Sequence, residues 1–91
     1  MSTVTFEFEN RLKELIVLCR DDITINDVNE NTNLVTDFVF GSFEIIQLVT
    51  DIENAFGIEF DEEDLLIEKL SSYASLVLIL ENKLKHKIQE N

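Results

Sequence analysis

The 91-residue sequence contains no proline and no tryptophan, only two glycines, and a single cysteine and histidine. Because proline and glycine mark most linkers and tight turns, the elements of this chain must be recognised from periodicity and helix caps. One cysteine, Cys19, cannot form an internal disulfide, and together with His86 it supplies too few ligands for a structural zinc site. The sequence therefore excludes a disulfide or zinc scaffold, and we expect no metal site.

Basic residues are also scarce, with 7 Lys and Arg against 19 Asp and Glu and a formal net charge of -12. This charge repels nucleic-acid phosphates and anionic lipid headgroups, so we expect neither nucleic acid nor a membrane as partner. No apolar run reaches about 18 residues, and the first residues carry acids where a secretory signal needs bases. These features favour a cytoplasmic protein whose charged partners are basic.

The sequence does contain 45% hydrophobic residues beside 29% charged ones, a composition typical of globular chains. A chain of this length buries one core, so we expect a single domain over residues 1–91. We also expect it to be a monomer.

Apolar residues recur at steps of three and four in several segments, which is the period of an amphipathic α-helix. The pattern predicts an all-α, four-helix bundle with a long loop between helices 1 and 2 and a short helix 3. The predicted helices span about 6–20, 42–56, 62–66 and 72–88. Gly57 is a typical stop for the second helix, and Ser71 or Ser72 is a typical cap for the last.

The loop predicted over residues 21–40 is rich in Asp, Asn and Thr, whose side chains bond to their own backbone and favour turns. Its apolar residues predict that it packs against the core; they are Ile23, Ile25, Val28, Leu34 and Phe38. The polar residues at alternate positions resemble a calcium-binding loop. That interpretation fails, because Thr32 stands where such a loop needs glycine and Phe38 where it needs glutamate.

The negative charge is concentrated in the middle of the chain. Residues 21–68 include fourteen acids and no Lys or Arg, whereas the two flanks together hold five acids and seven bases. Such a stretch on a small domain can be a solvated surface. Because it coincides with the second predicted helix and the loops around it, we favour a docking face for basic partners.

The sequence offers no catalytic constellation. Cys19 lies on the apolar face of the first predicted helix, His86 lies in a Lys-rich helix end, and no nucleophile elbow or glycine-rich phosphate loop is present. We therefore expect that the chain is not an enzyme.

The segment 37–43, Asp-Phe-Val-Phe-Gly-Ser-Phe, leads from the loop into the second helix and resembles the corresponding segment of the acyl carrier proteins. The resemblance extends from Leu12 to about Lys83 and includes further matching segments: Thr32-Asn33-Leu34, residues 56–60, and Ser71-Ser72 with Tyr73 and Leu76. It departs at Gly41, which replaces the aspartate that usually precedes the serine, and at Val39, which replaces a usual glycine. That aspartate helps the modifying transferase to bind. Phe43 in place of leucine is a milder departure, and Gln47 and Asn54 stand where members of the family often carry acids.

The resemblance implies a bundle of the acyl-carrier type in which Ser42 holds a covalent 4'-phosphopantetheine arm, attached by a phosphopantetheinyl transferase. The arm would carry acyl or aminoacyl groups as thioesters in fatty-acid-like, polyketide or nonribosomal peptide-type biosynthesis, as in the stand-alone carriers. The residues implied for docking of transferring enzymes with basic patches are Phe43, Glu44, Ile46, Gln47 and Glu53. Those implied for the cargo pocket are Leu48, Val49, Ile52, Phe56 and Leu76. The alternative is an unmodified, carrier-like protein-interaction domain in which Gly41 marks a lost attachment site.

Overall fold

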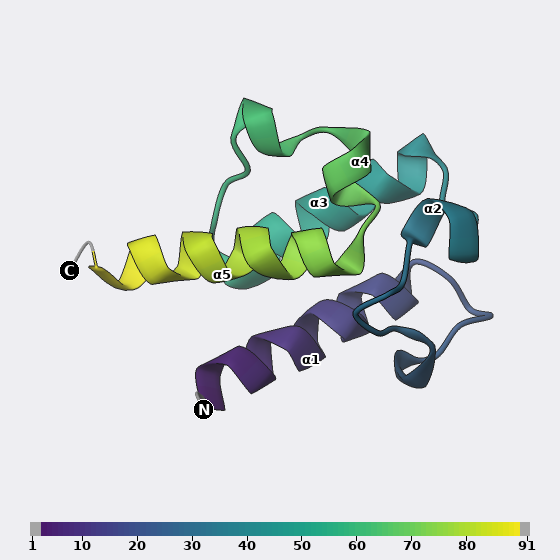
Figure 1. Ribbon diagram of the computed structural model, residues 1–91, viewed down its shortest axis with the longest axis horizontal. Helices are drawn as coiled ribbons and strands as arrows, with labels where there is room; N and C mark the ends of the chain where they lie inside the picture. Colours follow the sequence, from purple (N-terminus) through teal and green to yellow (C-terminus); the bar gives the residue numbers. More distant parts are fainter. Residues whose placement is uncertain (1–2, 90–91) are drawn as a thin grey trace.

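The computed structural model describes residues 3–89, so residues 1, 2, 90 and 91 of the predicted domain lie outside the described part. Within this part every regular element is a helix, and the one extended pairing is an isolated bridge. The long helices are α1 (Thr3–Leu18), α3 (Ser42–Phe56) and α5 (Tyr73–Gln89), and the short ones are α2 (Leu34–Asp37), α4 (Ile67–Leu70) and the 3₁₀ turns η1 (Ile25–Asp27) and η2 (Glu62–Asp64). Figure 1 shows α1 running opposite to α3 and α5. The all-α prediction is confirmed.

The core lies between the three long helices and is closed by residues from the segments that connect them. Each long helix buries a stripe at steps of three and four, as the sequence pattern predicts. The stripes are Phe8, Leu12, Leu15 and Ile16 on α1, Ile45, Leu48 and Ile52 on α3, and Tyr73, Leu76 and Leu80 on α5. Phe8 also meets Phe56 edge to face, with ring centroids 6.4 Å apart, and so joins α1 to the end of α3.

The segment of residues 21–40 is more regular than the predicted loop, because it contains η1 and α2. The Asn33 side chain accepts hydrogen bonds from the N–H groups of Val35 and Thr36, which starts α2. The Leu34 N–H donates to Ser71 O (2.6 Å), tying this segment to the residues before α5. Among the predicted anchors, Val28 and Leu34 are buried, Ile23 and Phe38 are partly buried, and Ile25 is exposed.

The short helix predicted at 62–66 is wrong in position. Residues Glu62–Asp64 form only the turn η2, and the helix α4 begins later, at Ile67. The Asp64 carboxylate accepts a hydrogen bond from the Asp61 N–H (3.0 Å), and Leu65 leaves the helical region with φ -88° and ψ 45°. The acidic side chains therefore close a turn on themselves in place of starting a helix.

The other helix bounds lie close to those predicted. Helix α3 spans the predicted residues and ends at Gly57, which has the left-handed φ of 65° expected of a helix stop. Helix α1 ends at Leu18, before the predicted Arg20, because the N–H groups of Cys19 and Arg20 bond three residues back and tighten the last turn. The Ser72 hydroxyl accepts a hydrogen bond from the Ser75 N–H (3.3 Å), which confirms a serine cap for the last helix.

Candidate functional site

Ser42 is exposed and occupies the first turn of α3, one residue after the N-cap, Gly41. The first N–H groups of a helix have no acceptor within the helix, and they lie at the positive end of its dipole. A negatively charged group attached to the Ser42 oxygen would therefore lie in a favourable field. The site fits a phosphate-linked substituent on this serine.

Glu44 caps the first turn of α3. Its carboxylate accepts a hydrogen bond from the Gly41 N–H at 2.6 Å, which is the return half of a capping box. The side chain is only partly exposed. The sequence predicts a docking role for Glu44, and the structure shows that this side chain also has a local structural role. Its position three residues after the N-cap is a signal that could have revealed this.

Arg20 joins the end of α1 to the start of α3. Its guanidinium donates to Phe38 O at 2.7 Å and lies 3.8 Å from Glu44 and 3.3 Å from Asp22. This role cannot be predicted from the sequence, because 22 positions separate Arg20 from Ser42 and no local pattern connects them. The result is a cation beside the segment that carries the serine.

Val39, three residues before Ser42, has a backbone φ of 59° and is 73% exposed. A β-branched residue in the left-handed region is strained, since its side chain crowds the backbone. The next residue, Phe40, is buried, and its N–H donates to Leu34 O at 3.0 Å. The turn is thus held from both sides, and its geometry explains why a glycine is the usual residue at this position in the carriers that the sequence resembles.

The remaining residues predicted for docking divide into two groups. Phe43 is 77% exposed and Ile46 is 64% exposed, and with Gln47 they share one outer face of α3, because residues three and four apart on a helix are neighbours. Glu53 is partly buried, and its carboxylate accepts a hydrogen bond from the Phe60 N–H (2.9 Å). Glu53 therefore holds the chain that follows α3.

The residues predicted for the cargo pocket lie together, in the core. Leu48, Ile52 and Leu76 are fully buried, while Val49 and Phe56 are partly buried against them. Their side chains pack closely, and a neighbouring cleft is lined by other residues.

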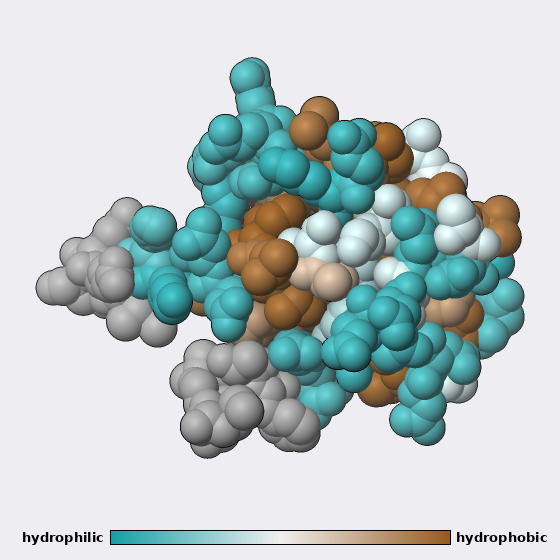
Figure 2. Space-filling model, viewed as in Figure 1, coloured by the Kyte–Doolittle hydropathy of each residue, from teal (hydrophilic) through white to brown (hydrophobic). Residues whose placement is uncertain are grey.

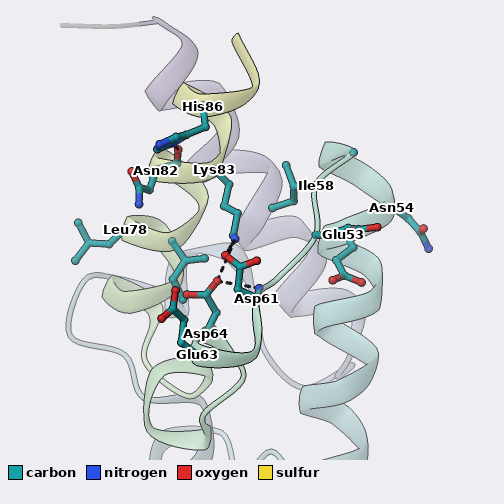
Figure 3. A pocket seen from close by; sticks show the side chains of 13 residues that line it. Glu53, Asn54, Ile58, Asp61, Glu63, Asp64, Leu78, Asn82, Lys83 and His86 are labelled. Atoms are coloured by element: carbon teal, nitrogen blue, oxygen red, sulfur yellow. Dashed lines mark hydrogen bonds and ion pairs between the residues drawn. The ribbon is translucent and has the colours of Figure 1, made fainter. Parts of the chain in front are cut away.

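That cleft, of about 1010 Å³, lies between the end of α3, the η2 segment and α5. Figure 2 shows apolar atoms exposed in a hollow between hydrophilic side chains. In Figure 3 the side chain of Lys83 extends from α5 toward Asp61 and Asp64, and its ammonium group lies 2.7 Å from the first carboxylate and 3.1 Å from the second. The hydrogen bond to Asp61 raises the pKa of Lys83 above its ordinary value.

Burial disfavours the charged form of Asp64, but the hydrogen bonds from the Asp61 N–H and from Lys83 outweigh it, so the pKa of Asp64 lies below its ordinary value. The ion pairs of Lys83 with Asp61 and Asp64 therefore connect α5 to the η2 segment across this cleft.

The described residues form neither a metal site nor an activated thiol. Among them, no three His, Cys, Asp or Glu side chains gather as a metal site would require. Burial raises the pKa of the Cys19 thiol, and the nearby charges of Asp51 and Glu44 raise it further, so this cysteine is a weak nucleophile. None of the helices in the described part has both the length and the apolar character needed to span a membrane.

Comparisons with known proteins agree on one family. Residues 13–80 match the PP-binding family, described as a phosphopantetheine attachment site. An acyl carrier protein of Thermotoga maritima is 36% identical over 59 residues, which are 65% of this chain and 70% of that protein. An acyl carrier protein of Coprothermobacter proteolyticus is 28% identical over 78 residues, or 86% of this chain and 87% of that protein.

The fold also has a solved counterpart. The solution structure of a protein from Anaplasma phagocytophilum, assigned as an acyl carrier protein, superposes with a TM-score of 0.68 at 22% identity. The superposition covers 89% of this chain and 94% of that one, and it supports the bundle architecture.

Proposed function

Because the chain belongs to the acyl carrier protein family, whose members carry covalent 4'-phosphopantetheine and are carriers without catalytic activity of their own, we propose that Ser42 is the attachment residue. The observation that carries this proposal is the exposed Ser42 hydroxyl in the first turn of α3, inside the matched segment. The helix end favours the negative charge that attachment adds. The arm supplies a thiol on which acyl or aminoacyl groups are held as thioesters.

The enzymes that load and unload the arm dock, on this proposal, on the outer face of α3 beside Ser42. Phe43 and Ile46 supply exposed apolar anchors there, and exposed apolar side chains next to a charged rim are typical of docking surfaces. The absence of Lys and Arg from residues 21–68 favours partners with basic patches. Glu44 and Glu53 contribute charge to this surface while they hold the backbone.

The cargo occupies, on the same proposal, the core beneath α3. Its lining would be the side chains of Leu48, Val49, Ile52, Phe56 and Leu76. Because Leu48, Ile52 and Leu76 are fully buried, a nonpolar cargo must separate side chains that now pack together. The proposed pathway is biosynthesis of a fatty-acid-like, polyketide or nonribosomal peptide-type product, with the carrier acting as a cytoplasmic monomer.

The second candidate is an unmodified interaction domain of the same fold. Gly41, in place of the usual aspartate before the serine, favours it, because a transferase would lose one charged contact there. The exposed apolar face of α3 would then serve a single protein partner.

Intact mass after incubation with coenzyme A and a broad-specificity phosphopantetheinyl transferase separates the two candidates. The attachment proposal predicts a gain of one phosphopantetheine in the wild type and in Ser75→Ala, and no gain in Ser42→Ala. Circular dichroism of Ser42→Ala checks that the variant is folded. No gain in the wild type, or a gain that persists in Ser42→Ala, would contradict the proposal.

A further inference from the structure

Arg20 is the last basic residue before a stretch of the sequence, residues 21–68, that contains no Lys or Arg. Its side chain is about one quarter exposed, and it is shared between the Phe38 carbonyl and the carboxylates of Asp22 and Glu44. A planar guanidinium donates in several directions at once, which suits this bridging position. Arg20 thus connects α1 to both sides of the turn that leads to Ser42.

Glu44 creates an electrostatic conflict at this place. Its carboxylate must stay near the start of α3 to accept from the Gly41 N–H at 2.6 Å. Loading of Ser42, two residues earlier, adds a second negative charge to the same helix end. Like charges this close repel one another, and the helix dipole compensates only part of that repulsion. Arg20, whose Nη1 lies 3.8 Å from Glu44, is the cation that the structure pairs with this carboxylate.

We propose that Arg20 is a positioning residue of the attachment site, which holds the turn before Ser42 and offsets the charge of Glu44 so that the loaded form is stable. The inference rests on the proposed attachment at Ser42. It predicts an effect that depends on loading: removing the charge of Arg20 should destabilise the loaded protein more than the unloaded one. A residue that only braced the fold would destabilise both forms equally.

The experiment compares melting temperatures of the unloaded and loaded protein for the wild type, Arg20→Gln and the double variant Arg20→Gln/Glu44→Gln. We expect Arg20→Gln to lower the melting temperature of the loaded form by about 2–5 °C more than that of the unloaded form, the size of a partly exposed charge interaction in a small domain. In the double variant, the amide that replaces the Glu44 carboxylate still accepts from the Gly41 N–H but carries no charge, so this extra loss should disappear.

Two further variants serve as controls. Arg11→Gln removes the same charge from the exposed side of α1, where Arg11 pairs with Glu14 at 3.2 Å, and should change both forms equally. Arg20→Lys keeps the positive charge but lacks the planar guanidinium, so it can lower the melting temperatures of both the loaded and the unloaded form. The difference between these two melting temperatures should nevertheless stay as in the wild type.

The outcomes separate this inference from the function on which it rests. A wild-type protein that gains no phosphopantetheine overturns the attachment proposal, and this inference with it. Where loading succeeds, equal losses in the two forms of Arg20→Gln overturn the inference alone. If Arg20→Gln does not fold, the lysine variant decides, because a changed difference between its loaded and unloaded forms contradicts the charge argument.

Discussion

The ammonium group of Lys83 lies 2.7 Å from the carboxylate of Asp61, a residue 22 positions earlier in the chain. The same group lies 3.1 Å from Asp64, and both ends of this second pair are mostly buried. These contacts fasten the acidic segment around η2 to α5. Because that segment leads into α4, the ion pairs also help to fix the chain between α3 and α5.

Replacing Lys83 by glutamine should release this segment. The loss should be about 1 kcal/mol in the free energy of unfolding, because Asp61 is exposed and only the pair with Asp64 is shielded from water. For a domain of this size that corresponds to a melting temperature about 4–8 °C lower. Lys85→Gln is the matched control on the same helix, exposed and expected to change stability by less than about 0.5 kcal/mol. Equal effects of the two variants would contradict the role assigned to Lys83.

The pair should also weaken in acid. Since the pKa of Asp64 in the folded state lies below its ordinary value of 3.8, its stabilising effect is complete above the unfolded pKa and disappears as the pH falls through the folded pKa. The melting temperature of the wild type should exceed that of Asp64→Asn at neutral pH. The difference should shrink below about pH 4, while the amide of the variant can still accept from the Asp61 N–H. A difference that stays constant from about pH 6 to about pH 3 would show that ionisation of Asp64 is not involved.

Val39→Gly should stabilise the protein. The left-handed conformation at this position costs valine about 1–2 kcal/mol, and glycine avoids that cost but loses about 0.5–1 kcal/mol of chain entropy on folding. The expected net gain therefore lies between about 0 and about 1.5 kcal/mol, measured by chemical denaturation. Val35→Gly is the control, because Val35 is helical in α2 and its replacement should destabilise the protein. A loss of stability in Val39→Gly would mean that the strain is absent.

The sequence is sufficient to predict those parts of the molecule that depend on local periodicity and caps. The helix Ser42–Phe56, its stop at Gly57 and the buried stripes of α1 and α5 follow from residues only a few positions apart. The acidic run at residues 61–64 predicts a helix start, but the same carboxylates can close a 3₁₀ turn, as they do here. Only the contact with Lys83, which comes from another part of the chain, shows where they point.

The surroundings of Ser42 were predictable only in part. Its position at the start of a helix follows from the pattern, but the contact of Arg20 with Glu44 depends on how α1 packs against α3. The strained φ of Val39 likewise results from anchors on both sides, at Leu34 and Phe40, that come together only in the folded chain.

Gly41→Asp should improve loading by a general transferase without harming the fold. A Cβ atom at this position would meet Glu44 Oε1 at 3.6 Å, an ordinary contact, and the φ of -92° is open to any residue. Aspartate is a good N-cap, but repulsion between its carboxylate and that of Glu44 opposes this gain, so stability should change by less than about 0.5 kcal/mol. The measurement is the initial rate of phosphopantetheine transfer by intact mass. Gly41→Asn has the same shape without the charge and should load at close to the wild-type rate; an equal gain in both variants would exclude an electrostatic role for aspartate.

Alanine at Phe43 or Ile46 should weaken docking while it leaves the fold intact. Both side chains are more than half exposed on one face of α3, so their removal should change the free energy of unfolding by less than about 0.5 kcal/mol. An aromatic or branched anchor at the centre of an interface contributes about 1 kcal/mol or more to binding, so the KM of the transferase for the carrier should rise roughly fivefold or more. Leu78→Ala is the matched control, because Leu78 is 65% exposed on α5 and lines the cleft at the end of α3, whereas Ser42 lies at the start of that helix. A KM that rises as much in Leu78→Ala as in Phe43→Ala would mean that the outer face of α3 has no special part in docking.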